Sequence, residues 1–209
     1  MRTEHLTVFI IDDDASVRDS IALMLGLSGY RTISFADAEA FLAGWREDWA
    51  GCVIADVRLP GKTGVELQDL MRQRGAALPF VIITAHGDVP TARAAFRSQA
   101  IDFLEKPFDN IQLCTAIETA FGVEERRIRR HDGRRADVEK LARLTARERE
   151  VLEQAALGLH AKEIAAVLGI SPRTVEVHKT RIMEKLDVRN VAELVRFAIA
   201  VNTSGENGN

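Results

Sequence analysis

The stretch "VFIIDDDAS", residues 8–16, places three consecutive carboxylates directly after four apolar residues. The run from Val8 to Ile11 is short, apolar and β-branched at three of its four positions, so it predicts a buried β-strand rather than a helix. The acids therefore follow the end of a strand. Carboxylates this close repel one another unless a cation or a hydrogen-bond donor lies beside them. The sequence thus predicts a positively charged partner at this point.

Asp14 has a structural explanation of its own. Asp is a favoured residue at the N-cap of a helix, and the segment "ASVRDSIALMLGL" has apolar residues at helical spacing. We therefore expect a helix that begins near Ala15 and is capped by Asp14. This interpretation leaves Asp12 and Asp13 without a structural role.

The composition describes a globular chain. Its 209 residues, 46% of them hydrophobic, are enough for one large domain or two small ones. No apolar run is long enough to span a bilayer, and the start "MRTEHLT" lacks the pattern of a signal peptide, so we expect a cytoplasmic protein without a membrane partner. Cys52 and Cys114 lack metal-ligand spacing and are expected to be reduced, packed thiols.

Charge is distributed unevenly along the chain. Residues 1–122 carry 11 Lys and Arg against 17 Asp and Glu, whereas residues 123–209 carry 17 against 14. An acidic first part and a basic second part suggest two domains, of which the second could approach a polyanion. The numbers are modest and are also compatible with a protein that binds no nucleic acid.

The first part alternates between strand-like and helical segments. Apolar strand-like runs recur at "RTISF", "CVIADV", "FVIITA" and "IDFL". Helical segments separate or follow them at residues 38–45, 64–74, 90–97 and 110–121. This alternation predicts an α/β fold with a five-stranded, doubly wound parallel sheet, in which ligands bind at the carboxyl ends of the strands.

Five polar residues stand at these strand ends: Asp12, Asp13, Asp56, Thr84 and Lys106. Each could be an ordinary turn or strand residue, but their joint placement is harder to assign to chance. Carboxylates with room for water suit Mg²⁺, and a hydroxyl with an ammonium would hold phosphoryl oxygens. One carboxylate is then free to act as a nucleophile, and Asp56 is the best placed.

This pattern resembles the motifs of two protein families. "FIIDDDAS" fits the motif of haloacid-dehalogenase-type phosphatases, in which Asp12 would be the nucleophile. That family needs a further acidic pair at a later strand end, which does not appear after Lys106, and it leaves Asp56 idle. Residues 5–122 more closely resemble response-regulator receiver domains, through the acidic pair, Asp56 before "VRLPG", Thr84 in "ITAHGD" and Lys106 in "FLEKPF".

The receiver resemblance implies a role for each matching residue. Asp56 is the expected phosphoacceptor, and Asp12, Asp13, Asp56 and the backbone carbonyl of Arg58 are expected to hold Mg²⁺. Thr84 and Lys106 are expected to contact the phosphoryl group, with Phe103 as the switch aromatic. The resemblance further implies a cis bond before Pro107 and positions that tune phosphoryl lifetime at Arg58 and His86. Where many receivers have a glycine before the fifth strand, this chain has Gln99 and Ala100.

Residues 123–141 are expected to form a helical linker. This segment includes six arginines between residues 126 and 135, with a glycine at position 133. We favour a solvated helix that loosens near Gly133 over direct contact with DNA.

The sequence of residues 142–209 predicts a four-helix helix-turn-helix domain. "TARE" at residues 145–148 is a capping box, Gly158 and Gly169 are expected to end the first two helices, and Ser171 with Pro172 begins a third. The third helix has an apolar stripe at Val175, Ile182 and Leu186. It also carries four cations that could neutralise DNA phosphates: Arg173, Lys179, Arg181 and Lys185.

From Leu144 to about Val201 the segment resembles the LuxR-type domain. The segments "LTAREREVL", "GLHAKEIAAVLGIS" and "RTVEVHKTRIMEKLDV" carry this resemblance. It implies that Glu176, Val177 and Thr180 face DNA bases, with Glu176 able to accept from cytosine N4. The residues expected near phosphates are Lys162, Arg173, Thr174, Lys179 and Arg181.

Together the two parts resemble the FixJ group of two-component response regulators. The resemblance implies a transcription regulator, not an enzyme, that accepts a phosphoryl group on Asp56 from a sensor histidine kinase. It also implies that the regulator dimerises on phosphorylation and binds double-stranded promoter DNA, with RNA polymerase as a candidate further partner. Two alternatives stay open: a constitutive DNA binder with a vestigial receiver, and the phosphatase.

Overall fold

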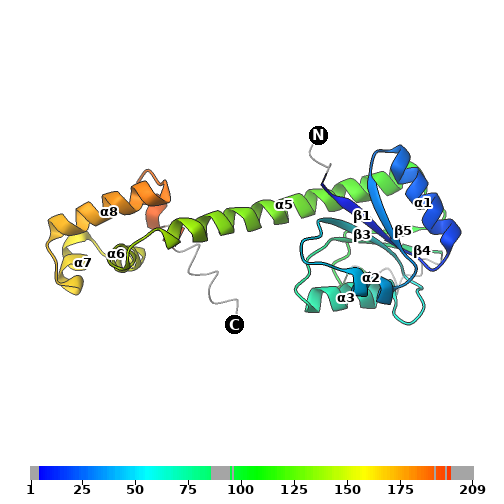
Figure 1. Cartoon of the computed structure of the whole chain (residues 1–209), viewed down its shortest axis with the longest axis horizontal. Helices are drawn as coiled ribbons and strands as arrows, with labels where there is room; N and C mark the ends of the chain where they lie inside the picture. The colour runs from blue at the N-terminus through cyan, green and yellow to red at the C-terminus, as the bar shows by residue number, and fades with distance from the viewer. Residues whose placement is uncertain (1–4, 86–94, 96, 191, 196, 199–209) are drawn as a thin grey trace. The chain divides into compact units, whose positions relative to one another are not determined.

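The computed structural model describes residues 5–85, 95, 97–190, 192–195, 197 and 198 (Figure 1). Within them the chain divides into two compact units, Met1–Ile128 and Arg129–Asn209. The helix expected at residues 90–97, His86 and the polar C-terminal segment lie largely or wholly outside the described residues. Among the described residues, no helix combines the length and the apolar composition that crossing a bilayer requires.

The first unit contains the predicted five-stranded parallel sheet. Its strands are β1 (Thr7–Ile11), β2 (Arg31–Phe35), β3 (Gly51–Asp56), β4 (Phe80–Thr84) and β5 (Asp102–Glu105), in the spatial order β2-β1-β3-β4-β5. All four pairings are parallel. β1, β3 and β4 are buried along their whole length, which explains why they read as continuous apolar runs rather than alternating ones.

Helices cover both faces of this sheet (Figure 1). α1 (Ala15–Leu27) and the first part of α5 (Asn110–Ala142) pack on one face, where Leu25, Leu113 and Ile117 are fully buried. α2 (Ala38–Gly44) and α3 (Gly64–Gln73) pack on the other. The doubly wound architecture predicted from the alternating sequence is confirmed.

Local signals in the sequence set several boundaries. Asp14 is the N-cap of α1, and its side chain accepts from the backbone N–H of Ser16 at 2.8 Å, as predicted. The Lys106–Pro107 bond is cis, as the receiver resemblance implied. Gln99 has a φ of 67°, a left-handed conformation that glycine adopts at little cost, which explains why many receivers have a glycine near this point. Cys52 and Cys114 are both free thiols.

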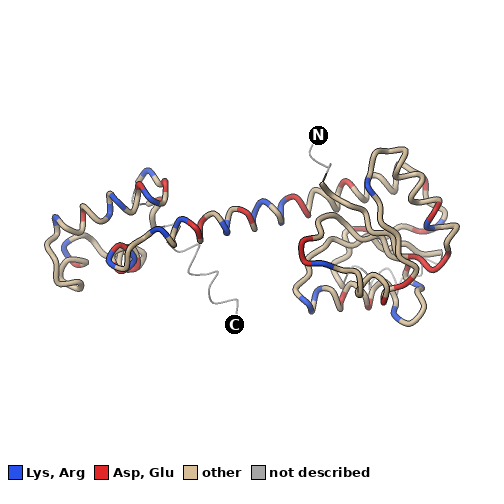
Figure 2. The backbone as a smooth tube through the Cα atoms, in the orientation of Figure 1, with Lys and Arg blue, Asp and Glu red and all other residues tan. Residues whose placement is uncertain are grey.

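α5 continues much further than the expected loosening at Gly133. It is one helix of 33 residues, and the division between the two units falls within it. An exposed glycine inside a helix costs only about 1 kcal/mol relative to alanine, and flanking pairs such as Arg135 with Glu139 favour the helix. Figure 2 shows basic and acidic residues interspersed along its length. The helical linker was expected to loosen near Gly133, but the helix is continuous through this residue.

The second unit contains the predicted helix-turn-helix. α6 (Ala146–Ala156) begins with the Thr145–Glu148 capping box, α7 (Ala161–Leu168) ends at Gly169 in a left-handed conformation, and α8 (Pro172–Leu186) is capped by Ser171. Residues 192–195, 197 and 198 are also helical. The apolar core of the unit includes Val151, Ile164, Val175 and Ile182, all fully buried.

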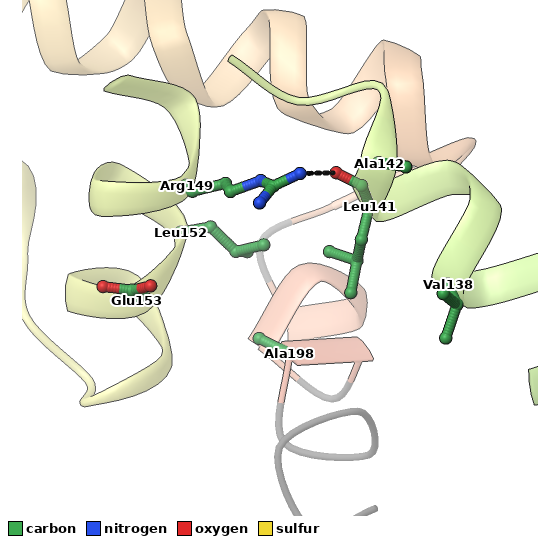
Figure 3. Close-up of a pocket in the computed structure, with 7 residues that line it drawn as sticks. All are labelled: Val138, Leu141, Ala142, Arg149, Leu152, Glu153 and Ala198. Atoms are coloured by element: carbon green, nitrogen blue, oxygen red, sulfur yellow. Dashed lines mark hydrogen bonds between the residues drawn. The ribbon is translucent and has the colours of Figure 1, made fainter. Parts of the chain in front are cut away.

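The C-terminal end of α5 packs into this unit. Leu141 and Ala142 of α5, Leu152 of α6 and Ala198 line a pocket of about 300 Å³ (Figure 3). Arg149 donates to the backbone carbonyl of Leu141 at 3.4 Å across one side of the pocket. This hydrogen bond places a cation at the last turn of α5, where free carbonyl groups concentrate negative charge.

Glu148 joins the start of α6 to the end of α8. Its side chain is 3% exposed and accepts from Lys185 Nζ at 2.6 Å and from the backbone N–H of Thr145 at 2.8 Å. Burial by itself favours the neutral carboxyl, but the hydrogen bonds from Lys185 and Thr145 outweigh it and lower the pKa of Glu148 to about 2. Lys185, expected to be available to DNA, is therefore engaged within the protein.

This pair predicts a pH-dependent contribution to stability. Because the folded pKa lies below the unfolded value, the contribution is complete above about pH 4.5 and is lost as the pH falls toward about 2. We expect Glu148→Gln to lower the free energy of unfolding by about 1–2 kcal/mol at pH 7, and by less at pH 3.5. The measurement is urea denaturation of the full chain, followed by far-ultraviolet circular dichroism.

Both tryptophans, Trp45 and Trp49, lie in the first unit, so tryptophan fluorescence in the same titration provides the control. The fluorescence transition should not change in the variant. An equal loss of stability at pH 7 and pH 3.5 would contradict the assignment of a charged Glu148.

Candidate functional site

The sheet brings the predicted acidic and basic residues to one edge. Asp12 directly follows β1, Asp56 is the last residue of β3, Thr84 is the last residue of β4, and Lys106 directly follows β5. The strand registers, in which Ile11 pairs with Ala55 and Asp56 with Ile83, align these strand ends. The carboxyl edge of a doubly wound sheet is where ligands bind in this architecture.

Lys106 connects the two buried carboxylates of this edge. Its ammonium group donates to Asp12 Oδ2 at 2.6 Å and also donates to Asp56 Oδ2. The side chains of Asp12 and Asp56 are 1% and 10% exposed. The positive partner that the acidic run required is therefore a lysine 94 positions later in the chain.

Two carboxylates, Asp12 and Asp56, share one ammonium, so this edge of the sheet has excess negative charge. Burial raises the pKa of Asp12, although Lys106 and the backbone N–H of Asp14 both donate to its carboxylate. Burial also disfavours the charged form of Lys106, but its hydrogen bonds to Asp12 and Asp56 prevail and raise the pKa of Lys106. One ammonium thus stabilises two carboxylates incompletely, and a second cation would be favoured at this edge.

The remaining oxygen donors are compatible with such a cation. Asp13 is exposed beside Asp12, and Arg58, whose backbone N–H donates to Asp56 Oδ1 at 2.9 Å, contributes a backbone carbonyl oxygen to the same turn. Within the described ranges, no three carboxylate, imidazole or thiol side chains already lie together as a metal cluster. The donor chemistry fits a hard divalent ion such as Mg²⁺, which binds oxygen and retains water ligands.

The turn after Asp56 is constrained by a close backbone approach. A Cβ atom on Gly64 would lie 2.3 Å from the carbonyl oxygen of Asp56, which no side chain tolerates. The N–H of Gly64 donates to the carbonyl of Val57 at 3.1 Å. Thr63 and Glu66 then form a capping box that begins α3. The turn that follows Asp56 therefore requires glycine at position 64.

Sequence reasoning missed Arg18. From the first turns of α1, its guanidinium donates to the backbone carbonyls of Asp12 at 2.7 Å and Asp13 at 3.1 Å. It therefore holds the acidic turn through backbone carbonyls rather than through the carboxylates. The signal was a cation one helical turn after the Asp14 cap, which is a weak signal because most such cations are solvated.

The other expected receiver residues lie where the strand assignments put them. Thr84 is 1% exposed, and the backbone N–H of Lys106 donates to its carbonyl at 2.7 Å. Phe103 is partly buried on β5 and packs against the apolar cluster that contains Phe80 and Ile82.

The face of α8 away from the core presents most of the residues expected to contact DNA. Glu176 has a side chain 62% exposed, and Val177 is 45% exposed. Arg173, Thr180 and Arg181 are also exposed, as is Lys162 on α7, whereas Thr174 is half-buried and its hydroxyl lies 2.8 Å from that of Ser171. The helix thus offers both polar and cationic groups on one surface.

Lys179 differs from this set. Only 8% of its side chain is exposed, and its ammonium lies 3.7 Å from Glu176 Oε1. It occupies the same stripe of α8 as Val175 and Ile182, at spacings of four and three residues. This stripe faces the core, which is a physical reason for the burial.

Known proteins with the same two parts were found by comparison. The family described as "Response regulator receiver domain" matches residues 8–118, and the family described as "Bacterial regulatory proteins, luxR family" matches residues 142–198. The transcriptional regulatory protein FixJ of Azorhizobium caulinodans is 44% identical over 197 residues, which is 94% of this chain and 93% of that protein.

Two solved structures are similar to this chain over most of its length. The structure of the response regulator StyR has a TM-score of 0.81 and 38% identity, covering 94% of this chain and 99% of that one. Full-length FixJ from B. japonicum has a TM-score of 0.56 and 39% identity, covering 94% and 97%.

The Lys106 geometry predicts a pH-dependent defect. In Lys106→Met, two buried carboxylates lose their shared cation, so we expect the free energy of unfolding to fall by about 2 kcal/mol at pH 7.5. The pKa of Asp12, already raised, should rise further. Because a raised carboxyl pKa destabilises the folded state only above the unfolded value, the defect should shrink as the pH falls toward about 4.

Urea denaturation followed by tryptophan fluorescence measures this effect in the first unit. Millimolar Mg²⁺ should restore part of the lost stability. Lys62→Met is the matched control, since Lys62 makes an exposed ion pair with Glu39 at 2.9 Å and should contribute less than 1 kcal/mol. A Lys106→Met chain as stable as the wild type at pH 7.5 would contradict the role of Lys106.

Proposed function

The chain belongs to the response regulators that join a receiver domain to a LuxR-type DNA-binding domain, and we propose that its receiver is phosphorylated on Asp56. It is a phosphorylation-activated transcription regulator of a family that is not a classical enzyme family. The observation that carries the proposal is Lys106, which binds Asp12 and Asp56 together at the carboxyl edge of the sheet. Residues 1–122, 123–141 and 142–209 are proposed as receiver, helical linker and DNA-binding domain.

The donor we propose is a sensor histidine kinase. An Asp56 carboxylate oxygen attacks the phosphorus of the kinase phosphohistidine, so a P–O bond forms while the P–N bond breaks and the imidazole takes up a proton. The product is an acyl phosphate on Asp56. Its turnover modifies the chain itself, so we do not propose an enzyme, and the phosphatase alternative with Asp12 as the nucleophile is not the family to which the chain belongs.

Asp12, Asp13, Asp56 and the carbonyl of Arg58 would hold Mg²⁺ in this proposal. When bound, the ion would neutralise charge on the phosphoryl oxygens. Lys106 would exchange its hydrogen bond to Asp56 for one to a phosphoryl oxygen, and the Thr84 hydroxyl would donate to another. The excess negative charge around Asp12 supports the need for a second cation in addition to Lys106.

Phosphorylation would be transmitted through β4 and β5. It adds about −1.5 to −2 charges at an acidic edge, and movement of Thr84 toward the phosphoryl group would free space beneath Phe103. The ring of Phe103 is only partly buried on β5, which supports its proposed inward shift. The reshaped face would pair two chains into a two-fold dimer.

The dimer would bind two half-sites of promoter DNA through α8. Glu176, Val177 and Thr180 are proposed to face bases, with Lys162, Arg173, Thr174 and Arg181 near phosphates; Lys179 is considered below. All of these residues except the half-buried Thr174 are exposed, and those of α8 lie on the face of that helix away from the core, which supports this assignment. Action at promoters would place the chain in the cytoplasm, with RNA polymerase as a candidate partner.

Phosphorylation-dependent assembly is the first prediction. Light scattering of the full chain with Mg²⁺ should show a shift from monomer to dimer after a small phosphodonor is added, and Asp56→Asn should show none. Intact mass must confirm that the wild type carries one phosphoryl group. In the same samples, the affinity for promoter DNA should rise in the wild type only.

Two outcomes would change the proposal. Equal DNA affinity of wild type and Asp56→Asn, whatever the phosphorylation state, would favour the constitutive binder with a vestigial receiver. A phosphorylated wild type that stays monomeric without DNA would exclude stable dimerisation in solution as the signal.

The DNA surface predicts a change in salt dependence. Arg173→Gln and Arg181→Gln should each reduce by about one the slope of log affinity against log salt concentration, because each removes one phosphate contact. Arg72→Gln, at an exposed arginine of α3, is the control and should leave the slope unchanged. Fluorescence anisotropy of a labelled duplex measures the slopes. Unchanged slopes in both Arg173→Gln and Arg181→Gln would show that this face of α8 does not contact DNA phosphates.

A further inference from the structure

Lys179 is a charged residue in the apolar stripe of α8. Val175, Lys179, Ile182 and Leu186 follow one another at spacings of four, three and four residues, and Val175, Ile182 and Leu186 are fully buried. Lysine is rarely buried to this degree unless it is paired. Its long apolar stem can pack in a core while the ammonium reaches toward the surface.

The ammonium of Lys179 lies within ion-pair distance of a residue on the exposed face of α8. Its ion-pair partner among the described residues is Glu176, one turn earlier on the same helix, at 3.7 Å. Glu176 remains 62% exposed, and its backbone carbonyl accepts from the Thr180 hydroxyl at 3.0 Å. A buried cation therefore lies beside an exposed carboxylate rather than on the surface that meets DNA.

The position of Glu176 presents an electrostatic problem. A carboxylate that approaches DNA is repelled by the phosphates, whose charge dominates binding. A carboxylate can nevertheless read a base, because it accepts a hydrogen bond from cytosine N4. A nearby cation that DNA cannot reach would reduce the repulsion and leave the outer carboxylate oxygen free to accept.

We propose that Lys179 is a positioning residue for base recognition, which holds and neutralises Glu176 instead of binding a phosphate. The inference rests on the proposed DNA-binding function of α8. It predicts that the protein prefers one C·G pair in each half-site, with Glu176 as the contacting group and Lys179 acting through it.

A double-mutant cycle tests this assignment. The probe is a duplex that the full-length wild-type chain selects from a pool with a randomised centre, in the presence of Mg²⁺ and a small phosphodonor. Affinities of wild type, Glu176→Gln, Lys179→Met and the double variant are then measured for this duplex and for all of its single base-pair substitutions. Methionine keeps the apolar stem of Lys179, so the core is preserved.

We expect Glu176→Gln to lose about tenfold of the discrimination at one base pair, the scale of one side-chain contact to a base. Lys179→Met should lose discrimination at the same base pair, and the double variant should match Glu176→Gln. Lys179→Arg, which retains the cation, should preserve the discrimination. A purely structural role of Lys179 would not single out one base pair.

Three results would overturn the proposal. In the first, Lys179→Met weakens binding to every duplex equally. In the second, Lys179→Met lowers the affinity as much in the Glu176→Gln variant as in the wild type. Either result would indicate that Lys179 contacts a phosphate. If circular dichroism shows that Lys179→Met is unfolded, Glu176→Gln decides, and unchanged discrimination at every position would refute the assignment. A wild-type chain that selects no duplex would refute the DNA-binding function itself.

Discussion

The first unit depends on one constraint: two buried carboxylates at neighbouring strand ends share a single ammonium. The ammonium of Lys106 donates to both Asp12 and Asp56, so it offsets part of the cost of burying two carboxylates at the edge of the sheet. Each of the three side chains comes from a different strand end, so the arrangement exists only when the parallel order of the sheet is complete. The chemistry of the edge and the topology of the fold therefore stabilise each other.

Cations in the second unit serve a different purpose. Lys140 donates to the carbonyl of Leu186 at 3.1 Å, and Arg147 donates to the carbonyl of Leu168, so each binds the last turn of a helix. Arg149 does the same for α5, and Lys185 pairs with Glu148. The positive charge of this unit thus stabilises helix ends and packing before any is available to a polyanion, and net charge overstates the basic surface that DNA can meet.

Periodicity and capping signals in the sequence predicted the strands, most helix boundaries and the five polar residues at or next to the strand ends, because each of these follows from local rules. Contacts between distant segments could not be predicted in this way. The bond from Arg18 to two backbone carbonyls, and the engagement of Lys185 by Glu148, depend on side-chain directions in the folded unit. Lys179 is different, because its place in the apolar stripe was visible at spacings of four and three residues, but the general preference of lysine for solvent obscured it.

The close approach of Gly64 to the carbonyl of Asp56 has a consequence for how this protein can change over generations. In the connection from β3 to α3, the backbone at Gly64 leaves no room for a side chain, so the number of residues between Asp56 and Gly64 is more tightly constrained than the exposed side chains between them. We therefore expect insertions and deletions to disrupt this turn, whereas substitutions at the exposed Arg58 and the partly exposed Lys62 should not. Variation among descendants would therefore change the side chains around Asp56 while the length of the turn that positions them stays the same.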